Sequence, residues 1–279
     1  MDNDAENQMI EIQLLLDAVY LKYGYDFRGY AEASLKRRIL RNLDFSGYRN
    51  ISELLHHVLN DKSCFEKLLL DLSINVTDMF RDPLFYKAIR DHVLPDLKKL
   101  PFIKVWHAGC ASGEEVYSMA ILFFEEGLDQ KTRVYATDFN EKILIAAREG
   151  IYSLEKMKAY TANYHQSGGK ASFGDYYAAR HDHAAIHESF KKNIVFAHHN
   201  LVSDGPFGEM DLIFCRNVLI YFNRNLQNRV FHLFNDSLGE GGYLCLGSKE
   251  SPRYSTCSDD FEDVVPKEKI YRKKMGLPV

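Results

Sequence analysis

Residues 107–120 read HAGCASGEEVYSMA, a run of small residues that holds Gly109 and Gly113 and ends in a helical apolar pattern. The preceding FIKVW segment is short and apolar, as a buried strand would be. In an open parallel sheet the loop after the first strand is the usual place for a cofactor. We therefore expect residues 109–113, called the glycine loop below, to bind a ligand.

The residues that flank the glycine loop indicate which ligand it binds. The dinucleotide motif Gly-x-Gly-x-x-Gly is absent, and Glu114 and Glu115 would repel a pyrophosphate at the start of the helix. The same carboxylates suit a cationic ligand with hydrogen-bond donors, such as S-adenosylmethionine. Asp138 ends the apolar stretch VYATD, 25 residues after Gly113, where an acid can accept hydrogen bonds from both ribose hydroxyls. Because small residues follow the first strand in many α/β proteins, these features favour this cofactor without establishing it.

Two unequal lobes are predicted to position these residues. Residues 10–72 have helical spacing without strand alternation, which indicates an all-α lobe. After Pro101, strands that are apolar throughout alternate with helical patterns, which is typical of a mostly parallel sheet covered on both faces. We expect an N-terminal helical domain and linker at 1–85 and a doubly wound, Rossmann-like α/β domain at 86–279. A stretch rich in Tyr, Gly and His, at about 152–190, predicts a small inserted β subdomain.

The stretch SLKRRILRNL in the first lobe separates apolar from basic side chains. At helical spacing, Leu35, Ile39 and Leu43 fall on one face, and the opposite face is basic. The basic residues are Arg37, Arg38 and Arg41, with Lys36 at the border. This basic face is either solvated surface or a docking surface for an acidic partner.

Composition limits the classes of protein to which the chain can belong. It has 279 residues, of which 46% are hydrophobic, and a net charge of -4, so whole-protein attraction to nucleic acid or anionic membrane is not expected. The cysteines are odd in number and scattered, which suits reduced thiols: Cys64, Cys110, Cys215, Cys245 and Cys257. The acidic N-terminus does not resemble a signal peptide, and no apolar run reaches the roughly 18 residues that span a bilayer. We expect a soluble, cytoplasmic protein without a metal site, and we interpret the histidines of HDHAAIH as solvated surface.

Several segments in a fixed order extend this interpretation to a family. They read NVTDMFRDP, HAGCASGEEVYSMA, ATDFNEKILIAAREGIY, the pair NL after the third strand, and DLIFCRNVLIYF. Together they resemble the CheR family of S-adenosylmethionine-dependent methyltransferases, which methylate glutamate side chains of bacterial chemoreceptors. The resemblance runs from about residue 30 to residue 251, and FCRNVLIYF and the NxTxxFR-like stretch are distinctive for that family.

The resemblance implies roles for individual residues. Those at the cofactor would be Asn75, Thr77, Arg81, Gly109, Glu115, Asp138, Asn200, Leu201, Asn217 and Val218. Glu114 is the less favoured alternative to Glu115, and Asp138 is the acid at the ribose. Arg81 and Tyr221 would lie nearest the methyl group and the incoming carboxylate. The spent cofactor would leave as S-adenosylhomocysteine.

Three of these side chains also have structural interpretations. Arg81 could cap a helix of the first lobe or pair with Asp82. Tyr221 could be a core aromatic residue. Asp138 could cap the helix that follows it, a role compatible with binding a ribose.

The chemistry of methyl transfer to a glutamate sets what the enzyme must supply. A glutamate carboxylate is already ionised at neutral pH, with a pKa of about 4.3, so no general base is required. The enzyme must instead align oxygen, methyl carbon and sulfur, an effect worth about 7–11 kcal/mol. Arg81 could orient the substrate or cofactor carboxylate through a forked pair of hydrogen bonds, and Tyr221 could donate to a carboxylate oxygen or line the cofactor pocket.

The resemblance also implies a partner, the cytoplasmic helical bundle of a chemoreceptor, whose methylation sites are acidic. The basic helix face described above has the matching sign. In some relatives the inserted subdomain tethers a receptor peptide by strand addition, but the insert of this chain departs from those versions in length and composition. The alternatives are the same chemistry on a receptor-like protein of a non-motility pathway, and a non-catalytic cofactor-binding partner. We expect a monomer that neither binds nucleic acid nor inserts into a membrane.

Overall fold

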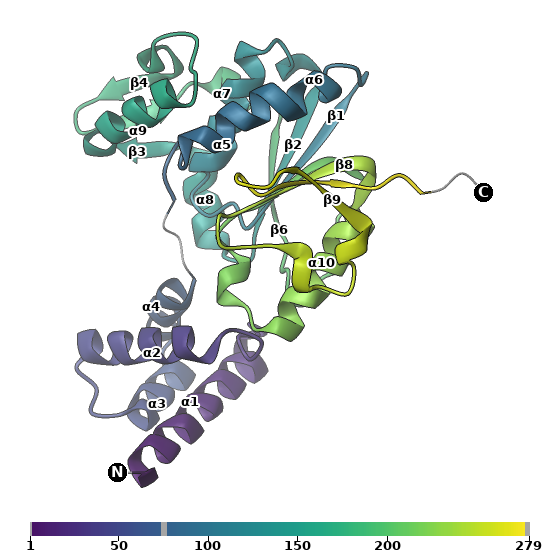
Figure 1. The fold of residues 1–279 in the computed structure, drawn as a ribbon. Coiled ribbons are helices and arrows are strands. Elements are labelled where there is room, and N and C mark those ends of the chain that lie inside the picture. The colour runs from purple at the N-terminus through teal and green to yellow at the C-terminus, as the bar shows by residue number, and fades with distance from the viewer. Residues whose placement is uncertain (1, 74–76, 277–279) are drawn as a thin grey trace. The chain divides into compact units, whose positions relative to one another are not determined.

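The chain falls into two compact units, and the computed structural model describes residues 2–73 and 77–276 (Figure 1). The first unit comprises Met1–Asn75 with Tyr221–Gln227, and the second comprises Val76–Ile220 with Asn228–Val279. The domain division expected at residue 85 differs from this grouping, because Met79 belongs to the hydrophobic core of the second unit. The segment before residue 85 is therefore packed with the α/β sheet.

Helices α1 (Asp2–Tyr23), α2 (Glu32–Ser46), α3 (Ile51–Asn60) and α4 (Lys62–Leu72) form the first unit. The ends of these helices follow from local sequence. The Asn50 side chain accepts a hydrogen bond from the Glu53 N–H and caps α3, and Asp61 caps α4 in the same way through Ser63. Gly47, with φ 73°, ends α2. Their buried faces share a core that includes Leu15, Val19, Ile39, Leu54 and Leu68.

The buried face of α2 differs from the predicted one at a single position. Leu35 and Ile39 are buried as expected. The third buried residue is Asn42 rather than Leu43, which is half-buried. Asn42 is accommodated because its side-chain amide donates to the Asp71 carboxylate of α4 at 2.5 Å. The helical core therefore contains a polar pair that apolar periodicity does not predict.

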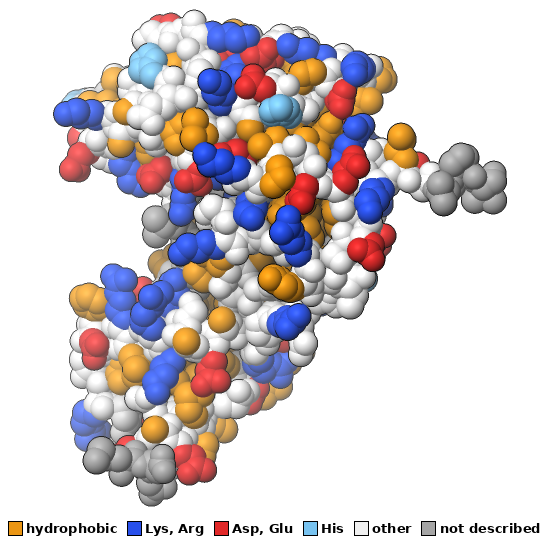
Figure 2. Space-filling view, in the orientation of Figure 1, with side chains coloured by type: hydrophobic (Ala, Val, Ile, Leu, Met, Phe, Trp, Pro, Cys, Tyr) orange, Lys and Arg blue, Asp and Glu red, His pale blue; other side chains and the backbone are white. Residues whose placement is uncertain are grey.

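The basic side chains of α2 do not share one environment. Arg37 and Arg41 are exposed, and basic side chains gather on the visible face of this unit beside α2 and α4 (Figure 2). Arg38 is half-buried: its guanidinium donates to the Asp71 backbone oxygen at 3.0 Å and lies 5.4 Å from the centre of the Tyr221 ring. Burial lowers the pKa of Arg38. Arg38 thus stabilises the helical unit, whereas Arg37 and Arg41 face solvent.

A seven-stranded sheet of order β6-β2-β1-β7-β8-β10-β9 forms the centre of the second unit (Figure 1). Its parallel strands are β6 (Ile194–His198), β2 (Thr132–Asp138), β1 (Ile103–Ala108), β7 (Met210–Cys215) and β8 (Leu238–Leu246). Two strands complete the other edge with antiparallel pairing, namely β10 (Ile270–Lys273) and β9 (Phe261–Val265). The predicted Rossmann-like, mostly parallel sheet is confirmed.

The helices of the second unit connect these strands. They are α5 (Pro83–Ala88), a π-helical turn (Ile89–Val93), α6 (Leu94–Leu97), α7 (Glu114–Glu125), α8 (Glu141–Glu149) and α10 (Arg224–Ser237). The chain runs outward from β1 to β2 and β6 and then returns to β7 on the other side of β1. Ligands bind at such a reversal, beyond the carboxyl ends of the strands. The loops after β1, β2, β6, β7 and β8 meet at that edge.

The insert after α8 consists of β3 (Ile151–Ser153), α9 (Leu154–Gln166), β4 (Tyr177–Arg180) and β5 (His183–Ile186). Its strands form an antiparallel sheet of order β3-β5-β4, which confirms the predicted β subdomain. The insert also contains α9, which the sequence did not indicate. The buried face of α9 consists of Met157, Tyr160 and Tyr164, so two of its three core positions are tyrosines with a polar end.

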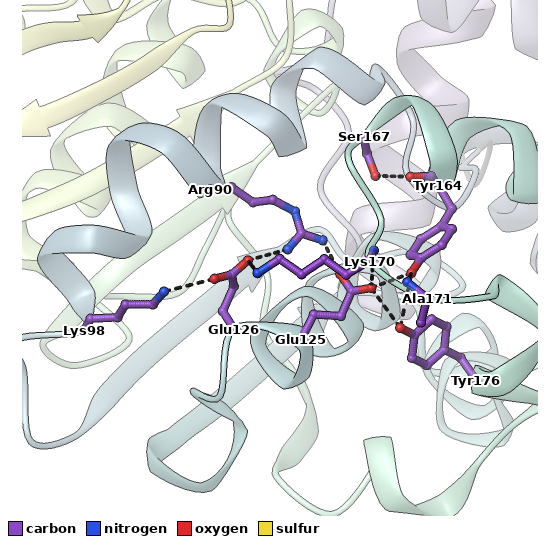
Figure 3. Close-up of polar contacts among 9 residues, drawn as sticks. All are labelled: Arg90, Lys98, Glu125, Glu126, Tyr164, Ser167, Lys170, Ala171 and Tyr176. Carbon is purple, nitrogen blue, oxygen red and sulfur yellow. Dashed lines mark hydrogen bonds and ion pairs between the residues drawn. The ribbon is translucent and has the colours of Figure 1, made fainter.

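Glu125, at the end of α7, fixes the insert to the sheet domain (Figure 3). Its carboxylate accepts hydrogen bonds from the Tyr176 hydroxyl at 2.8 Å, from the Lys170 N–H at 2.9 Å and from the Tyr164 hydroxyl. It also pairs with Arg90 of the π-helical turn. Burial opposes ionisation of Glu125, but these donors outweigh it and lower the pKa. A single buried carboxylate therefore joins α7, the π-helical turn and the insert.

Glu126 extends this cluster to the exposed side chains of Lys98 and Lys170 (Figure 3). Its carboxylate pairs with Arg90 at 2.6 Å, with Lys170 at 2.6 Å and with Lys98 at 2.9 Å. Partial burial opposes ionisation, yet these partners lower the pKa of Glu126 to about 2. Ionised Glu126 therefore stabilises the folded protein fully above the ordinary glutamate pKa of 4.5. This contribution is lost as the pH falls from 4.5 toward 2.

Substitution of Glu125→Gln is expected to destabilise the protein, because it leaves the buried Arg90 without its full counter-charge. The expected loss is about 3 kcal/mol, and the melting temperature should fall by roughly 6–12 °C. Thermal unfolding followed by circular dichroism measures the shift. The matched control is Glu188→Gln, which removes an exposed carboxylate paired with Lys191 and should change the melting temperature little. Equal small shifts for both variants would contradict the role assigned to Glu125.

Candidate active site

The glycine loop follows β1 at the carboxyl edge of the sheet. The N–H groups of Gly109 and Cys110 both donate to the Thr137 carbonyl of β2 at 2.9 Å, which folds the loop over its neighbouring strand. Gly109 and Gly113 have φ of 78° and 88°. A Cβ at Gly109 would lie 2.8 Å from Cγ2 of Val218. Both its backbone conformation and its close approach to the segment after β7 therefore require glycine at position 109.

Asp138 ends β2 directly beside this loop. Its carboxylate accepts a hydrogen bond from the Ala111 N–H at 3.1 Å and another from the Asn140 N–H at 3.0 Å. Burial raises the pKa of Asp138, and the backbone hydrogen bonds oppose that rise. The alternative that Asp138 caps the next helix is wrong, because the N-cap of α8 is Asn140, whose side chain accepts from the Lys142 N–H. Asp138 instead faces the glycine loop.

The two glutamates at the start of α7 have different surroundings. Glu114 is 2% exposed and accepts a hydrogen bond from the Ser112 hydroxyl at 2.7 Å, and burial raises its pKa. The Glu115 side chain is 19% exposed, lies 3.2 Å from Nδ1 of His107 and pairs with Arg216 at 3.0 Å. Burial opposes its ionisation, but His107 and Arg216 outweigh this and lower the pKa of Glu115. Glu115 is thus the more accessible and the more firmly ionised of the two.

Arg216, just after β7, is a site residue that sequence reasoning missed. Its side chain is 3% exposed, and its guanidinium also pairs with Asp82 at 2.7 Å and lies 3.9 Å from the centre of the Phe85 ring. It therefore joins α7, the end of β7 and the turn before α5. The available signal was an arginine that directly follows the apolar strand in DLIFCRNV, but its partners are more than 100 residues distant in the chain.

The backbone around Arg81 is fixed on both sides. Phe80 and Asp82 have φ of 52° and 57°, a region that residues other than glycine seldom adopt. The Phe80 N–H donates to the Ser118 hydroxyl of α7 at 2.9 Å, and that hydroxyl donates to the Glu114 carbonyl at 2.7 Å. Ser118 is fully buried and was also missed from the sequence. Contacts with α7 on one side and with Arg216 on the other therefore hold the turn that carries Arg81.

Asn217 and Val218 lie in the loop after β7. Asn217 has φ 62°, and its N–H donates to the Glu250 carboxylate at 3.0 Å. The approach of Val218 to Gly109 brings these predicted residues to the glycine loop. The structure therefore assembles predicted residues from two loops that are more than 100 positions apart in sequence.

Asn200 and Leu201 lie in the loop after β6, beside Asp138. The N–H of His199 donates to the Asp138 carbonyl at 3.2 Å, which places this loop next to the end of β2. The Asn200 side chain accepts from the Val202 N–H at 3.0 Å and so shapes its own turn. Leu201 is 7% exposed.

The insert contacts two of the predicted site segments, which the sequence did not suggest. The Tyr152 hydroxyl donates to the Ser112 carbonyl of the glycine loop at 2.8 Å. The Asn163 amide donates to the Met79 carbonyl, two positions before Arg81, at 3.1 Å. The insert therefore supports the glycine loop and the turn around Arg81 at the same time.

The remaining predicted residues are placed elsewhere or are not described. Asn75 lies outside the described residues, and Thr77 is partly buried. Tyr221 belongs to the first unit, where its carbonyl accepts from the Ala31 N–H at 2.8 Å. Within residues 2–73 and 77–276, no three His, Cys, Asp or Glu residues group as metal ligands. Over the same ranges, no helix has the length and apolarity needed to cross a membrane.

The geometry fits an S-adenosyl group. The glycine loop packs closely against Val218 at Gly109, and the acid of Asp138 stands beside the loop at the end of the neighbouring strand. Glu115 adds an ionised carboxylate with part of its surface open. A positively charged ligand with a ribose would find both an acceptor for its hydroxyls and a favourable charge.

Comparison with known proteins agrees with this fit. Residues 75–266 match the family described as "CheR methyltransferase, SAM binding domain", and residues 10–73 match "CheR methyltransferase, all-alpha domain". The "Putative methyltransferase Cher3" of Pseudomonas putida is 50% identical over 267 residues, which covers 96% of this chain and 98% of that protein. The "Chemotaxis protein methyltransferase" of Listeria monocytogenes is 31% identical over 81% of this chain and 84% of its own length. The "Chemotaxis protein methyltransferase 1" of Vibrio cholerae is 34% identical over 69% and 70%, respectively.

The fold and these matches define a methyltransferase that uses S-adenosylmethionine. The chain belongs to the CheR methyltransferase family, since the two family matches together cover most of its length. The predicted family, fold class and cofactor are thereby confirmed. The roles of the individual site residues stay predictions.

The cofactor affinity is expected to depend on pH through Asp138. Burial raises the pKa of this carboxyl above its ordinary value of 3.8. Ribose hydroxyls donate to the ionised form, so binding should lower that pKa, and affinity should fall as the pH decreases through the pKa of the free protein. Titration calorimetry with S-adenosylhomocysteine at several pH values measures this. Asp138→Asn should bind about 10- to 100-fold more weakly and lose this pH dependence; an unchanged profile in the variant would rule out Asp138 as the source.

The choice between Glu115 and Glu114 can be tested by paired amide substitutions. Glu115→Gln is expected to raise the Kd for S-adenosylhomocysteine by about 10-fold, because it removes an ionised and partly exposed acceptor. Glu114→Gln should have a smaller effect, since its carboxylate is buried against Ser112. Glu188→Gln removes an exposed carboxylate paired with Lys191, away from the glycine loop, and serves as the control. A larger effect at Glu114, or an equal effect of Glu188→Gln, would overturn the assignment.

Proposed function

We propose that this protein transfers a methyl group from S-adenosylmethionine to glutamate side chains in the cytoplasmic helical bundle of a chemoreceptor, forming glutamate methyl esters. The observation that carries the proposal is the family: relatives that align with two thirds or more of this chain are named chemotaxis protein methyltransferases. The name of the Pseudomonas putida relative specifies no pathway. The second candidate is therefore the same reaction on a receptor-like protein of a non-motility pathway.

A set of side chains and loops at the carboxyl edge of the sheet holds the cofactor in this proposal. It comprises Asn75, Thr77, Arg81, Gly109, Glu115, Asp138, Asn200, Leu201, Asn217 and Val218. Asp138 accepts from the ribose hydroxyls. The pair Asn200 and Leu201 and the pair Asn217 and Val218 flank the adenine and methionine portions. The bound cofactor supplies an electrophilic methyl group. The approach of Val218 to Gly109 supports this arrangement, because it brings the two loops together at the carboxyl edge of the sheet.

The acceptor needs orientation rather than deprotonation. A glutamate carboxylate is ionised at neutral pH, so its oxygen is already a nucleophile. Arg81 orients either the acceptor or the cofactor carboxylate through a forked pair of hydrogen bonds. The backbone that holds Arg81 is fixed by Ser118 and Arg216, which limits the positions its guanidinium can take. Tyr221 is the second side chain proposed to lie near the acceptor.

The basic face of α2 is proposed to dock the acidic receptor helices. Of its four basic residues, Arg37 and Arg41 are exposed, Lys36 is partly buried, and Arg38 is committed to the unit itself. Phe45 is 81% exposed, and its ring lies 5.5 Å from the Arg41 guanidinium. The solvent-facing part of this surface therefore combines positive charge with an aromatic side chain. Charge of this kind mainly speeds association and sets partner preference.

The proposed function is tested by measuring the transfer of a labelled methyl group from S-adenosylmethionine to protein. Purified protein is incubated with methyl-labelled S-adenosylmethionine and membranes that contain chemoreceptors. The expected result is label on the receptor that is released as methanol in mild base, as methyl esters are. Receptors whose methylation-site glutamates are changed to alanine are the matched control and should take up no label.

The possible outcomes separate the candidate functions. Base-labile label on a different protein would show that the other protein, and not the chemoreceptor, is the methyl acceptor. Binding of S-adenosylhomocysteine without any transfer would indicate a non-catalytic signalling partner. Label that is stable in base would exclude carboxylate methylation altogether.

Charge reversal at the exposed arginines tests the docking surface. The double variant Arg37→Glu and Arg41→Glu should raise KM for the receptor about 10-fold or more, with the kcat and the Kd for S-adenosylhomocysteine unchanged. The effect should shrink at high salt, because exposed charges are screened. The control is Lys192→Glu, an exposed basic residue of the second unit. If both variants lose receptor methylation equally, α2 has no special role in docking.

A further inference from the structure

Glu250, in the loop after β8, is a buried carboxylate that binds backbone. The residue is 4% exposed. Its carboxylate accepts hydrogen bonds from the Gly247 N–H at 2.6 Å, from the Asn217 N–H at 3.0 Å and from the Ile220 N–H at 3.2 Å. One side chain therefore joins the loop after β8 to the loop after β7.

The loops after β7 and β8 are in close contact. Strands β7 and β8 are parallel neighbours, with Cys215 opposite Leu246, so both loops leave the sheet at the same edge. A Cβ at Gly247 would lie 2.7 Å from the Asn217 nitrogen and 2.7 Å from Oε2 of Glu250. Glycine at 247 thus allows the carboxylate to reach both loops at once.

The hydrogen bonds to Glu250 act on the segment proposed to contact the cofactor. Asn217 has φ 62°, an unfavourable conformation for a residue other than glycine. The bonds to Asn217 and Ile220 span this strained turn from both ends and hold Val218 between them. Val218 in turn lies against Gly109 of the glycine loop. The shape of the cofactor site on this side is therefore set by Glu250.

We propose that Glu250 is a positioning residue for the methyltransferase reaction, in which its ionised carboxylate holds residues 217–220 in the conformation that binds the cofactor. The proposal rests on the assignment of Asn217 and Val218 to the cofactor site. It does not depend on which protein accepts the methyl group.

An amide cannot replace this carboxylate. Both oxygens of Glu250 accept from backbone N–H groups, whereas a glutamine would point its own N–H groups at one of these donors. Glu250→Gln is therefore expected to raise the Kd for S-adenosylhomocysteine by about 10- to 100-fold. Titration calorimetry measures the Kd, and circular dichroism measures the melting temperature of the same samples.

The matched control separates positioning from general stability. Asp211→Asn also changes a carboxylate that accepts from a backbone N–H, that of Lys104 at 2.7 Å, but it lies at the start of β1 and β7, at the opposite edge of the sheet from residues 217–220. It should leave the Kd unchanged, whatever its effect on the melting temperature. An unchanged Kd in Glu250→Gln, or equal increases in both variants, would overturn the proposal. Unchanged affinity in Asn217→Ala together with Val218→Ala would also overturn it, because the assignment on which it rests would be lost.

Hydrogen exchange of the unaltered protein provides a second test, which can be made even if Glu250→Gln does not fold. The amides of Asn217, Ile220 and Gly247 should exchange slowly without ligand and more slowly with S-adenosylhomocysteine. Exchange at the rate of free loop amides would contradict the proposal. A protein that binds S-adenosylhomocysteine with these features but methylates no receptor would refute the proposed function alone.

Discussion

The carboxylate of Asp138 is the interaction on which the rest of the site depends. It stands at the end of β2 and fixes the glycine loop through Ala111 and its own turn through Asn140. Burial of this charge is unfavourable, as its raised pKa indicates, and the backbone donors offset the cost only in part. Ribose hydroxyls that donated to Asp138 would offset the cost further. In the proposed site, the group that shapes the loop would therefore also favour a ligand that carries a ribose.

The parts of the structure that follow from local pattern could be predicted from the sequence. Apolar strands alternating with helices gave the parallel sheet, and the position of Asp138 at the end of VYATD placed an acid beside the glycine loop. The left-handed conformation of Gly109 follows from the need for a tight turn after β1. Family motifs then extended the site to the loop after β7, where the structure brings Val218 to Gly109.

The residues that were missed depend on contacts between distant segments. Arg216 finds its partners Glu115 and Asp82 only when the sheet has formed, and Glu250 finds its donors only because β7 and β8 are neighbours. Asn42 has the same origin, since a polar residue in a helical core is acceptable only beside Asp71. Hydrophobic periodicity predicts which face of a helix or strand is buried. It does not predict which polar group of a distant segment will pack against that face. These positions therefore required the three-dimensional structure.

A crystal structure of the protein with S-adenosylhomocysteine would show whether Asp138 holds the ribose. Both ribose hydroxyls are expected within about 3 Å of the Asp138 carboxylate oxygens, with the nucleoside beside the glycine loop at the carboxyl edge of the sheet. A ribose that makes no hydrogen bond to Asp138, or a ligand bound away from the carboxyl edge of the sheet, would contradict this expectation.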